Sequence, residues 1–125
     1  MINLRILLRS FRHAFAGIAV VFRTEQSFRL QTCAALIVIV FSTWVRVTSI
    51  ELVILLMMIA CVLVLELINS VFERIVDTSK PRIHPMVGEI KDIMAGAVLL
   101  SSLVAVGVGA VILAPYLVVL VQPSF

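Results

Sequence analysis

The sequence has few charged residues and none of the motifs of a soluble nucleotide-binding enzyme. Charged residues make up 14% of its 125 residues, against about 25% in typical soluble domains. It contains neither the GxxxxGK[ST] sequence of a P-loop nor the glycine-rich loop of protein kinases. Its two cysteines and two histidines do not have the spacing of a zinc site, and Cys33 and Cys61 are expected to be small core residues of apolar helices. A soluble domain and a zinc enzyme are therefore disfavoured.

Apolar residues dominate the chain. They make up 62% of it, and the mean hydropathy is +1.22. A helix that crosses a bilayer needs about 20 predominantly apolar residues, and three segments satisfy this, at about 27–47, 50–77 and 90–121. We therefore expect one all-α integral-membrane domain over residues 1–125 with three transmembrane helices and no separate soluble domain.

The first 24 residues predict a helix that lies on the membrane surface. Arg5, Arg9, Arg12 and Arg23 fall within about 60° on a helical wheel, while leucine and phenylalanine side chains gather on another face. A basic stripe beside an apolar face is typical of an amphipathic helix in the headgroup plane. The arginines also interrupt the apolar run that a cleavable signal peptide would need, so no such signal is expected.

The distribution of basic residues predicts the orientation. Every Lys and Arg except Arg46 lies in the N-terminal segment or around a second, polar loop at residues 78–90. The positive-inside rule then places the N-terminus and this loop in the cytoplasm. We expect a multi-pass protein of the bacterial plasma membrane. Glu51, close to Arg46 at the start of the second span, is expected to face water or Arg46.

A stripe of polar residues ends the second span. Glu66, Asn69, Glu73 and Asp77 share a wedge about 80° wide on one helix. With a rise of about 1.5 Å per residue, Glu66 lies some 24 Å along the helix from Ile50, still within a hydrocarbon core of about 30 Å. Carboxylates at that depth indicate a functional site. Three further polar residues are expected at the same cytoplasmic edge: Glu25, Lys91 and Asp92.

Carboxylates with an amide and several cations suit Mg²⁺ and a polyphosphate, because Mg²⁺ is usually held by one or two carboxylates plus substrate phosphates. Phosphoryl transfer also needs a group that takes a hydroxyl proton, and Glu66 is the candidate general base. Two alternatives stay open on the residues alone. One is a small ion channel or proton-coupled carrier that uses the stripe as ion ligands. The other is a membrane scaffold in which the acids pair with the N-terminal arginines.

Three blocks of the sequence resemble the prokaryotic diacylglycerol kinase and undecaprenol kinase family. They are FRTEQSFR at residues 22–29, ELINSVFERIVD at 66–77 and KDIMAGAVL at 91–99, and the resemblance extends over about residues 10–115. It implies a homotrimer of three-span subunits with active sites shared between neighbours. It also implies transfer of the γ-phosphate of MgATP to the hydroxyl of a membrane lipid alcohol, with no nucleic-acid partner.

The resemblance also implies roles for individual residues. Glu66 would be the catalytic base, and Glu25 and Glu73 would hold Mg²⁺ and so contribute to nucleotide binding. The lipid substrate would contact Glu66, Ala95 and Arg29. The residues that would orient the nucleotide or support its site are Asn69, Asp77, Lys91 and Asp92, with His13, Arg82 and His84 aligned more weakly.

Some details favour the undecaprenol kinase branch. Leu30-Gln31 stands where the best-known diacylglycerol kinase pattern has Gln-Glu, so one acidic site residue is missing. Ala95-Gly96-Ala97-Val98 and His84-Pro85 are more similar to the undecaprenol kinases. We therefore expect undecaprenol to be favoured over diacylglycerol as the lipid acceptor.

Overall fold

The computed structural model describes residues 3–78 and 85–122, and this part of the chain is helical. The four helices are α1 (Leu4–Thr24), α2 (Gln26–Trp44), α3 (Ser49–Thr78) and α4 (Pro85–Val121). Three of them are long and apolar enough to cross a membrane, over Gln26–Trp44, Ser49–Thr78 and Met86–Val121. The all-α class and the three spans predicted from the sequence are confirmed.

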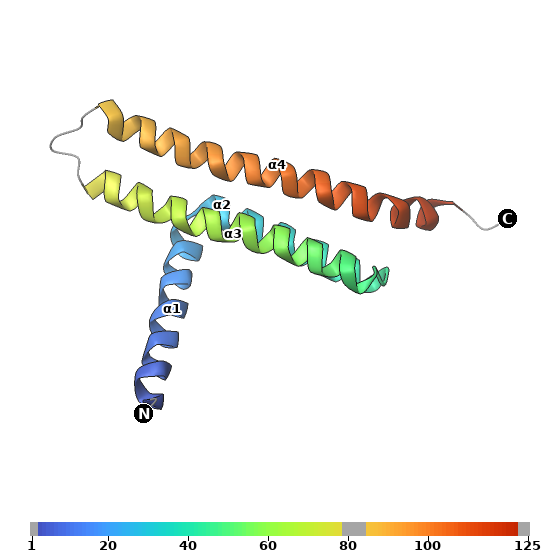
Figure 1. The fold of residues 1–125 in the computed structure, drawn as a ribbon, viewed down its shortest axis with the longest axis horizontal. Helices are drawn as coiled ribbons and strands as arrows, with labels where there is room; N and C mark the ends of the chain where they lie inside the picture. Colours follow the sequence, from blue (N-terminus) through green and yellow to red (C-terminus); the bar gives the residue numbers. More distant parts are fainter. Residues whose placement is uncertain (1–2, 79–84, 123–125) are drawn as a thin grey trace.

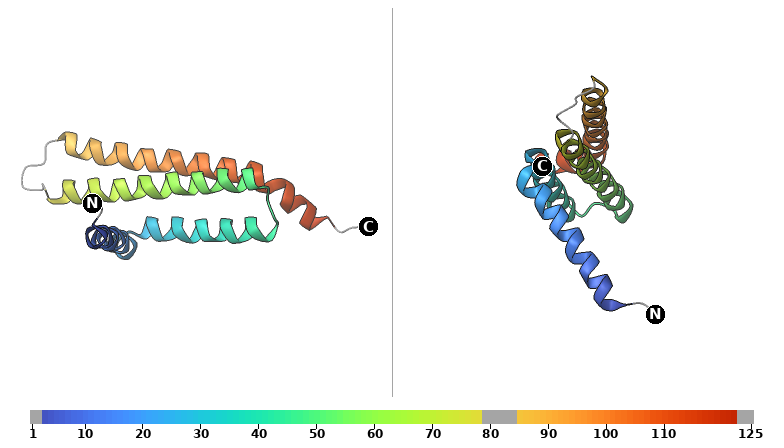
Figure 2. Two further views of the ribbon diagram at one scale, coloured as in Figure 1. Left: turned by 60° about the horizontal axis from the view of Figure 1, so that its bottom comes forward. Right: turned by 90° about the vertical axis from the view of Figure 1, so that its left-hand side faces the viewer.

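The three long helices run side by side, and α1 leaves one end of them crosswise (Figure 1). Helix α3 packs against both α4 and α2, so that α3 lies between the other two when the molecule is turned (Figure 2). The buried apolar side chains are few, with Leu55 and Val62 on α3, Phe28 and Ala35 on α2 and Val98 on α4. The interior of a single chain is therefore a thin seam along α3.

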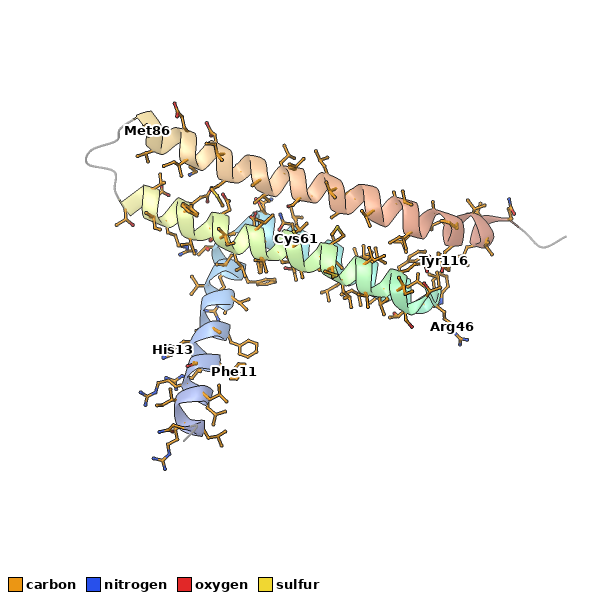
Figure 3. The ribbon with its side chains drawn as sticks, in the orientation of Figure 1. Phe11, His13, Arg46, Cys61, Met86 and Tyr116 are labelled. Atoms are coloured by element: carbon orange, nitrogen blue, oxygen red, sulfur yellow. The ribbon has the colours of Figure 1, made fainter. Side chains whose placement is uncertain are left out.

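Most of the large apolar side chains lie on the outside of the chain. Val106 and Val111 of α4 are more than two-thirds exposed, as expected for helices whose outer faces meet lipid or another subunit. Cys33 and Cys61 are both free and exposed, and Cys61 is labelled in Figure 3. The expectation that they are core residues is wrong for the single chain, because only one narrow face of each helix is covered.

Helix α1 begins at Leu4 with an Asn3 cap, whose side-chain oxygen accepts a hydrogen bond from the Arg5 backbone N–H at 3.2 Å. Nearly all of its residues are exposed, and Val21 is its one buried residue. Phe11 and His13 point to opposite sides of the helix (Figure 3). The sides differ in chemistry, which is what the predicted surface helix requires.

The turn between α2 and α3 is fixed by local hydrogen bonds. Arg46 adopts a positive φ of 57°, and the Val47 N–H donates to the Ser42 carbonyl at 3.1 Å, which together form a Schellman motif at the end of α2. Thr48 and Glu51 then form a capping box. The Thr48 N–H donates to Glu51 Oε2 at 2.8 Å, and the Glu51 N–H donates to Thr48 Oγ1 at 3.3 Å.

Helix α4 starts earlier than the sequence predicted and contains a proline. It begins at Pro85, within the region assigned to a polar loop, because proline has no N–H to leave unbonded and suits the first position of a helix. Pro115 lies inside the helix, which changes direction over its last turns (Figure 2), as expected where a proline removes one backbone hydrogen bond.

Candidate active site

The polar stripe of α3 runs from the interior of the chain to its surface. Glu66 and Asn69 are buried, with 4% and 9% of their surfaces exposed, Glu73 is intermediate and Asp77 is exposed. The 3-4-4 spacing places all four on one side of the helix. The stripe therefore connects a carboxylate inside the apolar layer with the end of α3 that lies beside the start of α4.

Glu25 is the single residue between α1 and α2, and its backbone is extended, with φ −98° and ψ 117°. Its Oε1 accepts a hydrogen bond from Thr24 Oγ1 at 3.0 Å and pairs with Arg74 Nη2 at 3.4 Å. The same Arg74 nitrogen donates to Thr24 Oγ1 at 2.7 Å. The junction of α1 and α2 is thereby tied to α3.

Two carboxylates from separate parts of the sequence, Glu25 and Glu73, lie near Glu66. The charges of Glu25 and Glu73 both act on Glu66, and the Gln31 side chain of α2 lies against its carboxylate. Farther along the stripe, Lys91 Nζ of α4 lies 3.8 Å from Glu73 Oε1. The structure thus brings Glu25, Glu66, Glu73 and Lys91, four of the residues singled out in the sequence, near one another.

Several buried polar atoms of this region have no hydrogen-bond partner among the described residues. They include Asn69 Oδ1, Gln31 Oε1 and Ser70 Oγ. Buried polar atoms in folded proteins are normally bonded, so unpartnered ones in an otherwise structured site indicate where a ligand or a second chain would bind. Asn69 lies one helical turn from both Glu66 and Glu73, which makes its amide the clearest of these positions.

The carboxylates fit Mg²⁺ as partial ligands only. Within residues 3–78 and 85–122, no three His, Cys, Asp or Glu side chains are arranged so that they could hold a metal by themselves. Mg²⁺ commonly takes only one or two carboxylates and completes its shell with water and substrate phosphates. Glu25 and Glu73 offer that kind of hard oxygen donor, and the flexible Lys91 cation paired with Glu73 is one that a metal would replace.

Other predicted residues lie apart from this centre. Asp92 and Ala95 are exposed on α4, and His13 is exposed midway along α1, away from α3 (Figure 3). Arg29 Nη1 donates to the backbone carbonyls of Arg23 at 2.9 Å and Phe22 at 3.3 Å, so its guanidinium caps the end of α1. Arg82 and His84 lie outside the described residues.

Sequence reasoning overlooked three members of the site. Thr24 and Arg74 hold Glu25, and Gln31 lies against Glu66. Thr24 and Arg74 stand directly beside predicted site residues in the sequence, which was the available signal. Gln31 lies on α2 three residues after the buried Phe28, so the two side chains share one face of the helix.

An apolar groove begins beside Glu66 and continues along the membrane spans. It has a volume of about 530 Å³ and lies between α2, α3 and α4. Gln31 and Ser102 are its polar lining residues, and the rest are aliphatic, alanine or glycine. The lining extends from Leu63 to Leu55 on α3 and from Ser102 to Leu117 on α4. A chain-like apolar ligand fits this shape better than a compact polar one.

Comparison with known proteins identifies the family of the chain. The sequence model of the prokaryotic diacylglycerol kinase family matches residues 12–113. The chain is 37% identical over 110 residues to a diacylglycerol kinase of Synechocystis sp., a match that covers 87% of this chain and 63% of that relative. It is 33% identical over 115 residues to an undecaprenol kinase of Bacillus subtilis, covering 92% and 94% of the two chains. With a diacylglycerol kinase of Escherichia coli the identity is 29% over 100 residues, covering 80% and 82%.

The matched region contains every element of the site. It starts within α1, ends just before Pro115 of α4, and includes the α1–α2 junction, the polar stripe of α3 and the first half of α4. The chain spans less than two-thirds of the Synechocystis relative but nearly all of the Bacillus one. On this match the chain belongs to the prokaryotic diacylglycerol kinase family, a family of membrane lipid kinases.

Proposed function

We propose that this chain transfers the γ-phosphate of ATP to the hydroxyl of a membrane lipid alcohol at the cytoplasmic face, with undecaprenol preferred over diacylglycerol. The observation that carries the proposal is the position of Glu66. Its buried carboxylate lies where an apolar groove, on one side, meets the carboxylates of Glu25 and Glu73, on the other. A lipid hydroxyl and a nucleotide phosphate can reach each other only at such a boundary.

In this reaction Glu66 acts as the general base. It accepts the proton of the lipid hydroxyl as that oxygen attacks the γ-phosphorus, and a positioned base contributes about a hundredfold or more to such a step. The side chain is 4% exposed, so bulk water has little access to compete with the lipid hydroxyl. Gln31, which lies against the Glu66 carboxylate, limits its orientations.

The nucleotide would bind at the exposed end of the stripe. Glu25 and Glu73 would hold Mg²⁺, which neutralises phosphate charge when bound. Lys91, freed from Glu73 by the metal, would reach a phosphate oxygen. Asn69 supplies a buried amide whose oxygen has no partner among the described residues. The further nucleotide contacts that we propose from the family resemblance are Asp77, Asp92, His13, Arg82 and His84.

The lining of the groove supports undecaprenol as the acceptor. The atoms that follow the hydroxyl-bearing carbon of undecaprenol are hydrocarbon, whereas diacylglycerol has two ester groups close to its hydroxyl. An ester carbonyl in the groove would lose its hydrogen bonds to water, and apart from Gln31 and Ser102 the lining offers no side chain to replace them. From the family resemblance we also propose that Ala95 and Arg29 contact the lipid near its head, outside the groove.

A homotrimer with shared sites and a cytoplasmic N-terminus completes the proposal. The thin interior of one chain and its exposed valines and leucines on α4 support association with further copies. The basic residues at one end support the orientation. The exposed apolar and basic sides of α1 support its place in the headgroup layer.

The test is phosphate transfer from radiolabelled ATP by the purified protein with Mg²⁺, with undecaprenol and diacylglycerol offered separately. We expect label in undecaprenol, less label in diacylglycerol, and loss of both in Glu66→Gln. Glu89→Gln is the matched control, since it makes the same change at an exposed position of α4. Folded protein that labels neither lipid would exclude the kinase, and ion flux in vesicles would then be measured.

A further inference from the structure

Arg74 follows Glu73 directly but serves a different part of the fold. Successive residues of a helix point about 100° apart, so Glu73 faces Lys91 on α4 while Arg74 faces the junction of α1 and α2. The Arg74 guanidinium reaches Thr24 Oγ1 at 2.7 Å and Glu25 Oε1 at 3.4 Å. Thr24 Oγ1 also donates to Glu25 Oε1 at 3.0 Å. The three side chains close a small cluster.

Glu25 depends on this cluster for its position. It is the one extended residue between two helices, and although it is the N-cap residue of α2, its side chain does not cap that helix. Thr24 moves together with Glu25, because they are neighbours in the chain. Arg74 therefore supplies the only hydrogen bond that we find, in the described part of the chain, between the Glu25 carboxylate and α3, the helix that carries Glu66 and Glu73.

We propose that Arg74 is a positioning residue, which bridges α3 to the α1–α2 junction and holds the Glu25 carboxylate in register with Glu73 for a divalent cation. This inference rests on the proposed function, in which Glu25 and Glu73 are the Mg²⁺ ligands. Within the described residues, the hydrogen bonds and the ion pair of the cluster engage Glu25 through Oε1. The second oxygen, Oε2, is the one that would face the cation.

Arg74 has two opposite effects on a bound cation. Its positive charge repels the metal, while its hydrogen bonds fix one of the ligands. The Arg74 side chain is 45% exposed, so water and salt screen the repulsion, whereas we find no other hydrogen bond from α3 to the Glu25 carboxylate among residues 3–78 and 85–122. The restraint outweighs the charge. Removing Arg74 should weaken cation binding about threefold to tenfold, the effect of losing one or two hydrogen bonds at a partly exposed site.

The test measures binding of Mn²⁺ alone to the full chain in lipid nanodiscs, without nucleotide, from the electron paramagnetic resonance signal of free Mn²⁺. The variants are Arg74→Ala, Arg74→Lys and Arg74→Met, with Arg12→Gln as a control that removes one exposed positive charge from α1. We expect weaker Mn²⁺ binding in Arg74→Ala, partial recovery in Arg74→Lys, and no change in Arg12→Gln. The Mg²⁺ concentration for half-maximal activity should rise by the same factor in Arg74→Ala, with kcat at saturating Mg²⁺ nearly unchanged.

A general loss of structure would lower kcat as well, so the split between kcat and the Mg²⁺ requirement is specific to positioning. If Arg74→Ala does not fold, Arg74→Met takes its place, because methionine keeps much of the side-chain length without a hydrogen-bond donor. Mn²⁺ binding in the variant equal to or tighter than in the parent would overturn the inference. Where Glu25→Gln loses Mn²⁺ and Arg74→Ala keeps it, only the role of Arg74 fails. If the parent neither binds Mn²⁺ nor labels a lipid, the proposed function fails with it.

Discussion

The Tyr116 hydroxyl donates a 2.7 Å hydrogen bond to Glu51 Oε2, which joins α4 just after Pro115 to the first turn of α3. The same carboxylate oxygen accepts bonds from the Thr48 N–H and hydroxyl, each at 2.8 Å. One carboxylate thus caps α3 and also holds the far end of α4, and both Tyr116 and Arg46 lie at this end of the molecule (Figure 3). The opposite end, where Met86 is labelled, contains the candidate site.

Tyr116→Phe should lower the melting temperature of the detergent-solubilised protein without lowering its activity. The change removes a hydrogen bond to a charged acceptor and leaves the ring in place. Glu51→Gln should lower the melting temperature further, because it weakens the cap of α3 as well. The double variant should lower the melting temperature by less than the sum of the two single decreases. Strict additivity would show that the two residues are not coupled.

Arg46→Gly should stabilise the protein. Arg46 has a φ of 57°, a conformation that costs an L-residue about 1 kcal/mol and costs glycine almost nothing. Arg46→Ala is the control, because it removes the same charge and keeps the side-chain Cβ. We expect the glycine variant to melt above the parent and the alanine variant to melt at or below it. Equal melting temperatures for the two variants would show that strain at this position is negligible.

The elements of this fold follow from the sequence because they depend on local properties. Hydropathy and length define the three spans, and the ends of the four described helices fall close to the predicted bounds, except that α4 starts at Pro85. The 3-4-4 spacing of Glu66, Asn69 and Glu73 likewise fixes a common helix face. These predictions needed no knowledge of how the helices pack.

The contacts between helices could not be predicted in the same way. We expected Glu51 to face water or Arg46, and it is half-exposed, but its bond to Tyr116 was not predicted, because Tyr116 lies 65 residues away and reaches Glu51 only once α4 has packed on α3. The pairing of Arg74 with Glu25 depends on the angle at which α1 leaves α2 (Figure 1). A helical wheel gives the direction of a side chain but does not identify the element that it meets.

Substitutions of Asn69 and Ser70 should separate effects on activity from effects on stability. Both are buried, at 9% and 2% exposure, and Asn69 Oδ1 and Ser70 Oγ have no hydrogen-bond partner in the described part of the chain. Ser70→Ala should keep activity and leave stability equal or higher, because it removes an unbonded polar atom. Asn69→Leu should be equally stable, yet its kcat/KM for MgATP should fall about tenfold or more, the effect of losing one good hydrogen bond to the nucleotide.

Phosphate transfer over a range of MgATP concentrations, together with thermal melting, checks this pair. If Ser70→Ala loses as much activity as Asn69→Leu, the stripe is needed only for packing. If Asn69→Leu retains activity, its amide does not contact the nucleotide, and the unpartnered oxygen is then satisfied by a neighbouring subunit.

The groove between α2, α3 and α4 leads to a prediction about the length of the lipid. Ala110 lines the groove, while the next residue, Val111, is exposed on the outside of α4. Ala110→Phe should fill the groove beyond the reach of a short prenol. The KM for undecaprenol should then rise about tenfold, the order of effect expected when a large side chain is forced into occupied space. Val111→Phe adds the same ring outside the groove and should change neither the KM for undecaprenol nor that for a short prenol.

The measurement compares the parent and both variants with undecaprenol and with a prenol of three isoprene units. A short tail that ends near Glu66 should be phosphorylated equally well by all three proteins, because the ring at position 110 lies well along α4 from Ser102, where the groove meets the site. A selective loss of undecaprenol phosphorylation in Ala110→Phe would show that the tail runs along the groove. Equal losses with both prenols would indicate that the ring disturbs the packing of α3 on α4. If neither substrate is affected, another subunit fills the groove, and the lipid must approach Glu66 from the outer side of α2.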